Sequence, residues 1–129
     1  MLERLFIRDF ILVDRLELEF GTGFGALTGE TGAGKSILVD ALGLVLGARA
    51  EASMVRPGGE RAELSAEFSL PAGSPVRSWL DDQDFAADEE VLLVRRVIDA
   101  GGRSRAYING VPASVTQLRE AGALLVDIH

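Results

Sequence analysis

Eight residues near the start of the chain restrict its fold more than any other feature of the sequence. The segment Gly29–Ser36 reads GETGAGKS and matches the pattern G-x-x-x-x-G-K-[ST] at every fixed position. A short apolar stretch, Phe24–Thr28, precedes it, and a long apolar stretch follows it, as when a buried strand runs into a helix. In such a turn, backbone N–H groups and the positive helix end can surround phosphate groups. The segment therefore predicts an α/β fold with a phosphate-binding loop.

Each residue type in this motif has a chemical role. The glycines permit backbone angles and a close approach that a side chain would block. Lys35 would reach the β and γ phosphates as the catalytic residue, and the Ser36 hydroxyl would ligate Mg²⁺. Lys35 is also the only lysine among 13 basic residues. The alternative is an ordinary glycine-rich turn with an exposed lysine. The predicted cofactors are ATP and Mg²⁺, bound by Gly29, Glu30, Thr31, Gly32, Ala33, Gly34, Lys35 and Ser36.

Composition excludes several other classes of protein. The chain has 129 residues, 47% of them hydrophobic, which is enough for one domain with a packed core. Its net charge of -7 excludes a chain-wide surface for a polyanion. The absence of cysteine and the single histidine, His129, exclude a disulfide scaffold and a multi-histidine metal centre. No apolar run approaches the roughly 20 residues of a membrane span, so we expect a cytoplasmic protein without a membrane partner.

Alternating apolar residues and turn signals predict the remaining elements. Besides the strand Phe24–Thr28, we expect two strands before the motif, three in an antiparallel sheet after it, a buried strand at 124–129, and three helices. The helix after the motif should end at Gly47, and a short helix should begin at Ser74, before Pro75. The last helix should begin at a Ser114 and Gln117 capping box and end at Gly122. The acidic run 81–90 is expected to be a solvated loop. The predicted strands are 2–7, 15–20, 62–68, 91–98, 104–108 and a buried strand 124–129, and the predicted helices are 36–46, 75–80 and 114–121.

A nucleotide-hydrolysing enzyme also needs an acid that orders Mg²⁺ at the end of a neighbouring strand. Asp127 is the one candidate, and any buried strand with a terminal acid looks the same. The lack of N-K-x-D weighs against a GTPase. A small-molecule kinase would need an arginine-bearing lid. Four arginines could supply it, although their strand-like setting predicts side chains that face solvent: Arg95, Arg96, Arg103 and Arg105.

Several segments together resemble the N-terminal part of SMC-like, ABC-type ATPase heads. The resemblance is strongest to the heads of bacterial DNA repair ATPases. These segments are 5–10, 16–20, 28–38 with 40–42, 46–50, 102–110 and 125–129. The resemblance implies the P-loop NTPase core of an ABC/SMC head with an antiparallel β lobe, as the N-terminal half of a split head. It divides 1–129 into strands, loop and helix (1–50), a mainly antiparallel β lobe (51–112), and a helix and core strand (113–129) leading to a Q-loop beyond residue 129.

By the same resemblance, Asp127 is a strand-end residue, and the Walker B acid and signature motif lie in the C-terminal half of the head. The residue that contacts adenine could lie near Phe6 or Arg8, but the sequence does not identify it. For Phe6 itself, we expect a side chain that packs in the core.

The resemblance also implies a function. ATP would join two heads, each nucleotide lying between one phosphate loop and the other head's signature motif. Coiled coils would convert this cycle into the holding of DNA ends during double-strand break repair, on the nucleoid. The implied partners are DNA, through other parts of the protein, the C-terminal half of the same head, and a second copy. The alternatives are a self-contained small-molecule kinase and an interaction module that binds ATP with little turnover.

Overall fold

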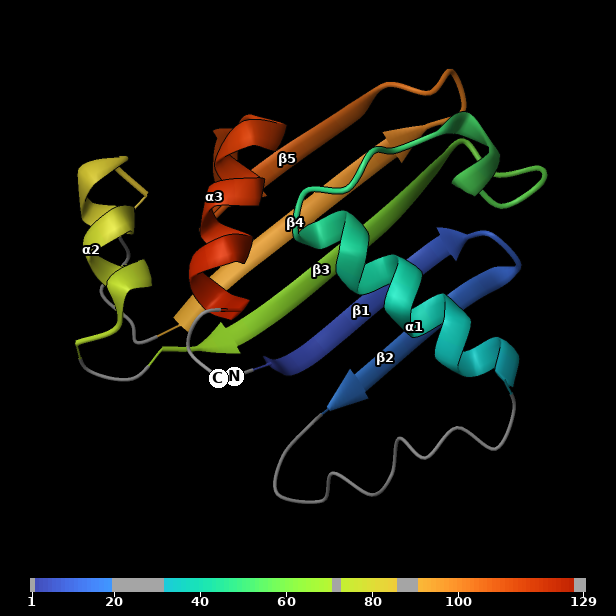
Figure 1. Ribbon diagram of the computed structural model, residues 1–129. Helices are drawn as coiled ribbons and strands as arrows, with labels where there is room; N and C mark the ends of the chain where they lie inside the picture. Colours follow the sequence, from blue (N-terminus) through green and yellow to red (C-terminus); the bar gives the residue numbers. More distant parts are fainter. Residues whose placement is uncertain (1, 20–31, 71–72, 86–90, 127–129) are drawn as a thin grey trace.

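A single antiparallel sheet organises the part of the chain that the computed structural model describes, namely residues 2–19, 32–70, 73–85 and 91–126 (Figure 1). Its strand order is β2-β1-β3-β4-β5-β6. The strands are β1 (Leu2–Phe10), β2 (Val13–Glu19), β3 (Arg61–Ser69), β4 (Val91–Asp99), β5 (Ser104–Ile108) and β6 (Val111–Ala113). The helices are α1 (Gly32–Val45), the 3-10 turn η2 (Ala52–Met54), α2 (Pro75–Asp82) and α3 (Val115–Val126). The five longer strands confirm the predicted strands 2–7, 15–20, 62–68, 91–98 and 104–108, whereas β6 was not predicted.

Helices α1 and α3 lie over the same face of the sheet, and α2 lies beside α3 (Figure 1). Every second strand residue points to this face. In β3, for example, Leu64 is fully buried while its neighbours Glu63 and Ser65 are only partly buried. The core forms between this face and the two helices, with Leu5, Ile7, Leu44, Leu92, Ile98, Ile108 and Leu118 among its fully buried side chains.

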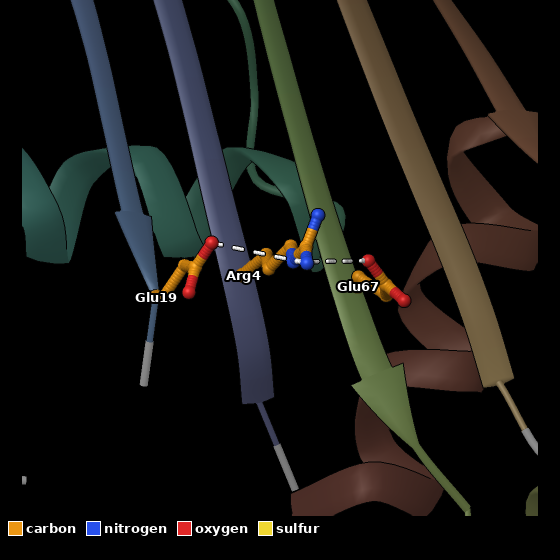
Figure 2. Close-up of polar contacts among 3 residues, drawn as sticks. All are labelled: Arg4, Glu19 and Glu67. Carbon is orange, nitrogen blue, oxygen red and sulfur yellow. Dashed lines mark ion pairs between the residues drawn. The ribbon is translucent and has the colours of Figure 1, made fainter. Parts of the chain in front are cut away.

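No described helix lies over the opposite face of the sheet, which we call the open face (Figure 2). Arg4, Arg15 and Arg95 on this face form ion pairs with glutamates of the same face. Arg4 lies between two carboxylates, 3.8 Å from Glu19 and 4.0 Å from Glu67. The strand register places the following residues on this face: Arg4, Phe6, Arg8, Arg15, Glu17, Glu19, Glu63, Ser65, Glu67, Leu93, Arg95, Val97, Arg105 and Tyr107.

Three predicted helix ends are confirmed. Gly47 follows α1 with φ +105°, and the N–H of Ala48 bonds the Gly43 carbonyl, which is the Schellman pattern of a glycine-ended helix. The Ser74 hydroxyl accepts from the Val76 N–H at the start of α2. At the start of α3, the Gln117 N–H donates to Ser114 Oγ, and the Ser114 N–H donates to Gln117 Oε1.

The predicted end of the last helix is wrong. Helix α3 passes through Gly122 and continues to Val126, so Leu124 and Leu125 are helical and do not begin a strand. At Gly122 the chain just after α1 approaches α3 closely: a Cβ there would lie 3.0 Å from the Leu46 carbonyl oxygen. Its small size serves packing and does not stop the helix. The last three residues of the predicted strand, 127–129, lie outside the described part of the chain.

Candidate nucleotide-binding site

Helix α1 begins inside the G-x-x-x-x-G-K-[ST] motif, at Gly32. The predicted helix after the motif is therefore confirmed. Gly29, Glu30 and Thr31 lie outside the described residues, as does the predicted strand Phe24–Thr28. For Gly32, Ala33, Gly34, Lys35 and Ser36, the structure gives the helical backbone only.

The start of α1 favours a negatively charged ligand. The first four N–H groups of any α-helix lack a partner within the helix, and here they belong to residues 32–35 of the motif. The helix dipole places about half a positive charge at this end. No acidic residue lies in the first turn, so no carboxylate of the helix competes for these N–H groups. The arrangement suits phosphate oxygens.

The carboxyl end of α1 is held by side chains from distant parts of the chain. Arg96 of β4 donates from Nη1 to the Leu44 carbonyl at 2.7 Å and also to the Ala48 carbonyl. Its Nη2 donates to Ser104 Oγ on β5 at 3.2 Å. Arg119 of α3 donates from Nε to the Gly47 carbonyl at 3.1 Å. Two guanidinium groups thus lie at the negative end of the helix dipole.

This contact corrects the prediction that Arg96 faces solvent, because its side chain is 1% exposed. Its burial lowers the pKa of the guanidinium, and the charge of Arg119 lowers it further. The strand alternation contained a signal for this, since Arg96 has the same parity as the buried Val94 and Ile98. The sequence does not show, however, that backbone carbonyl groups lie close enough to accept hydrogen bonds from a buried arginine at this position.

The other three arginines of that group do face solvent, as predicted. Arg95 lies on the open face, 3.2 Å from Glu63 Oε1 and over the Tyr107 ring. Arg103 and Arg105 are exposed and line a groove of about 260 Å³ together with Glu60, Arg61, Val97 and Asp99.

The two candidates for an adenine contact lie on the open face. Phe6 is half-buried there, with the Arg15 guanidinium 5.7 Å from its ring centroid. The prediction that Phe6 packs in the core is therefore wrong. Its β1 position has the opposite parity to the buried Leu5 and Ile7, so Phe6 points away from α1. Arg8 is exposed and lines a groove of about 420 Å³ that also holds Asp9, Gly58, Gly59, Glu60, Arg61 and Glu63.

The remaining candidate, Asp127, lies outside the described residues. Among the residues that are described, no group of three or more His, Cys, Asp or Glu side chains is placed to hold a metal ion. None of the described helices is both long enough and apolar enough to cross a membrane.

Comparison with known proteins places this chain in a family. Residues 4–105 match the family described as AAA domain, and the chain belongs to it. Over its whole length the chain is 49% identical to the DNA repair protein RecN of Vibrio cholerae and 41% identical to that of Bacillus subtilis. RecN is the bacterial DNA repair protein that the sequence was predicted to resemble, and this resemblance is confirmed. The chain spans 23% and 22% of these two relatives.

Solved structures confirm the predicted fold class. A structure described as "Structural biochemistry of ATP-driven dimerization and DNA stimulated activation of SMC ATPases" matches with a TM-score of 0.73 at 24% identity, over 97% of this chain and 79% of that one. The SMC head domain of Thermotoga maritima matches with a TM-score of 0.62 at 20% identity, over 92% and 41% of the two chains. The described sheet and helices therefore have the fold of part of an SMC-type head.

Proposed function

We propose that this chain is the nucleotide-binding part of the ATPase head of a RecN-like DNA repair protein. The observation that carries the proposal is the start of α1 at Gly32, inside the phosphate-loop motif, with no acidic residue in its first turn. The N–H groups of residues 32–35 bind the phosphates of ATP there. The relatives named RecN support a role in DNA repair, because the chain matches them over its whole length.

The motif residues divide the work of binding. Gly29, Gly32 and Gly34 allow the backbone to approach the phosphates, with Glu30, Thr31 and Ala33 completing the loop. Lys35 neutralises the β and γ phosphates, and the Ser36 hydroxyl holds Mg²⁺. The metal ion, when bound, supplies charge stabilisation to the phosphoryl group that is transferred.

Helix α1 also supports the proposal that a second part of the same head covers it. Its apolar residues extend around the whole helix, which is typical of a helix buried on all sides. In this chain, Ala41, Leu44 and Val45 are buried against the sheet, whereas Val39 is 69% exposed. The RecN relatives are about four times longer than the chain. The C-terminal half of the head is therefore our proposed occupant of the Val39 side of α1.

ATP-driven dimerisation and DNA-stimulated activation are described for the SMC ATPases that share this fold. For this protein we propose the same order of events, in which ATP joins two heads and hydrolysis releases them. DNA is held through other parts of the protein, since the chain carries a net charge of -7. Such a protein acts in the cytoplasm, on the nucleoid.

The structure does not favour the small-molecule kinase. Arg96 is buried against the carboxyl end of α1, and Arg95 is paired with Glu63 on the open face. Neither guanidinium is free to close over a substrate at the opposite end of α1, where the motif lies. These two arginines therefore make contacts within the fold and do not form part of a lid.

MgATP turnover tests the proposal. It should be measured with and without double-stranded DNA for the native-length protein, its Lys35→Ala variant, the control Arg77→Ala and the 129-residue chain. We expect DNA-stimulated turnover by the native-length protein and by Arg77→Ala, and none by Lys35→Ala. Sustained turnover by the 129-residue chain would instead show a complete enzyme and contradict the split head. Nucleotide binding without measurable turnover by the native-length protein would favour the interaction module.

A further inference from the structure

The carboxyl end of α1 receives its positive charge from outside the helix. The last turn of α1 contains no basic residue. Arg96 and Arg119 instead approach from β4 and α3, and they lie 52 and 72 residues after the carbonyl groups that they contact. The last carbonyl groups of a helix lack partners within it and carry its negative dipole end. Donors on two other elements therefore complete this end of α1.

Burial of the Arg96 guanidinium costs desolvation free energy. Burying a guanidinium requires hydrogen bonds to offset the loss of water, and the Arg96 Nε atom has no partner. The neighbouring inward positions on β4 hold Val94 and Ile98, which pack at no such cost. Buried charges are often no more stabilising than apolar residues of similar size. What Arg96 supplies, and an apolar residue would not, is a directional link.

This link joins three segments of the fold. From β4, the guanidinium bonds the Leu44 carbonyl in the last turn of α1, the Ala48 carbonyl just after the helix, and the Ser104 hydroxyl on β5. Because one planar group makes all three contacts, any sliding or rotation of α1 relative to β4 and β5 would break hydrogen bonds of a charged donor. A helix of 14 residues is a rod about 21 Å long, so a change of its direction at the carboxyl end would displace its amino end.

We propose that Arg96 is a positioning residue for nucleotide binding. It holds the carboxyl end of α1 on the sheet and thereby aims the N–H groups of Gly32–Lys35 at the phosphates. The proposal rests on the proposed function, namely that ATP binds at the start of α1. Linkage makes the effect reciprocal: a nucleotide at one end of α1 must tighten the arginine-held end to the same degree that Arg96 tightens nucleotide binding.

Nucleotide affinity tests the first half of this proposal. The dissociation constant of a fluorescent ATP analogue with Mg²⁺ should be measured for the native-length protein and its Arg96→Met, Arg96→Lys and Ser104→Ala variants. We expect Arg96→Met to weaken binding about tenfold, since hydrogen bonds from a charged group are lost. Arg96→Lys should recover part of this loss, because an ammonium can reach one carbonyl but not all three acceptors. Ser104→Ala should weaken binding about twofold, since one neutral acceptor is lost.

A matched control separates positioning from stability. Leu80→Ala removes buried volume in α2, away from α1, and should lower the melting temperature with an unchanged dissociation constant. Wild-type affinity in a folded Arg96→Met protein would overturn the proposal. If that variant does not fold, wild-type affinity in both Arg96→Lys and Ser104→Ala would overturn it. The Lys35→Ala variant distinguishes a failure of the Arg96 proposal from a failure of the proposed function. Wild-type nucleotide affinity in Lys35→Ala would contradict the proposed function itself.

Hydrogen exchange tests the reciprocal half. The N–H groups of Leu46, Gly47 and Ala48 bond carbonyls of the last turns of α1 and report on its carboxyl end. Adding MgATP to the native-length protein should slow their exchange, and in Arg96→Lys the slowing should be smaller. Equal slowing in the two proteins would show that Arg96 does not couple the two ends and would overturn the proposal.

Discussion

Gly122 of α3 lies against Leu46, just after α1, so closely that a Cβ atom at position 122 would be 3.0 Å from the Leu46 carbonyl oxygen and 3.2 Å from its Cβ. This contact sets the distance between the two helices that cover the sheet. We predict that Gly122→Ala destabilises the chain by about 1–3 kcal/mol because the helices must separate. Helix propensity alone predicts a gain of about 1 kcal/mol. Urea unfolding of the 129-residue chain and its Gly122→Ala variant measures whether the free energy of unfolding falls or rises.

Gly43→Ala is the matched control for this prediction. Gly43 lies inside α1, and a Cβ there would be 3.8 Å from the Ala48 Cβ, an ordinary contact. The substitution should therefore show the propensity gain, with a higher midpoint of urea unfolding. A stabilised Gly122→Ala chain would mean that α1 and α3 do not pack as described.

A second prediction concerns Asn109, at the turn between β5 and β6. Its Oδ1 accepts from the Leu93 N–H at 2.9 Å, its Nδ2 donates to the Phe85 carbonyl at 2.8 Å, and its φ is +51°. Asn109→Ala should cost about 2–3 kcal/mol because two hydrogen bonds are lost and alanine is strained at positive φ. Asn109→Gly should cost about 1 kcal/mol less, since glycine adopts this φ freely. Equal unfolding free energies for the two variants would contradict the backbone part of this account.

The open face gives a third prediction, about which of its arginines stabilises the fold. Arg4 is 58% exposed, and its two carboxylate partners lie 3.8 and 4.0 Å away (Figure 2). Arg95 has a shorter contact, 3.2 Å to Glu63, and also lies over the Tyr107 ring at 5.3 Å. Arg4→Gln should change the unfolding free energy by less than about 0.5 kcal/mol. Arg95→Gln should cost about 1 kcal/mol because it removes both an ion pair and a cation–π contact.

Thermal unfolding of both variants in low and high salt checks this ranking. Salt should reduce the ion-pair part of the Arg95 effect and leave Arg4→Gln almost unchanged. A larger loss for Arg4→Gln than for Arg95→Gln would show that the paired charges of Figure 2 contribute more than their distances indicate.

The exposed side of α1 gives a fourth prediction. Val39 is 69% exposed in this chain, and the proposed split head covers it with the C-terminal half. Val39→Glu should therefore change the stability of the 129-residue chain by less than about 0.5 kcal/mol, as an ordinary surface substitution. In the native-length protein it should cost more than about 2 kcal/mol, because a charge is buried. Equal effects in both would contradict a covering layer over this side of α1.

Sequence reasoning predicted the local features of the fold well. Strand alternation predicted the regions of five strands, and capping chemistry predicted the starts of α2 and α3 at Ser74 and Ser114. These features depend on neighbouring residues, which the sequence displays directly. The helix that begins inside the phosphate-loop motif was predicted for the same reason.

The errors arose where distant segments meet. Gly122 was interpreted as a helix end because its contact with Leu46 depends on the packing of α3 against α1. The short apolar run after Gly122 has no periodicity that separates a helix from a strand. Arg96 was expected to face solvent because the sequence does not reveal which carbonyl groups lie above β4.

The turn between β1 and β2 was also not predicted. Ile11 adopts φ +55°, a conformation that β-branched residues rarely take, so its sequence carries no turn signal. Two backbone hydrogen bonds hold this region against the end of η2 and the residues after it: Ile11 N–H to the Met54 carbonyl, and Arg56 N–H to the Asp9 carbonyl, each at 2.8 Å. Tertiary contacts thus impose a backbone conformation that local preference opposes.

Amine labelling of Lys35 tests the central claim, that ATP binds at the start of α1, most directly. Lys35 is the only lysine of the chain, so an amine-reactive reagent should modify this residue and the N-terminal amine alone. Mass spectrometry of the labelled chain then measures each site separately, with the N-terminal amine as the internal control. We predict that MgATP protects Lys35 from labelling and leaves labelling of the N-terminal amine unchanged. Equal labelling of Lys35 with and without MgATP would contradict a nucleotide site at this end of the helix.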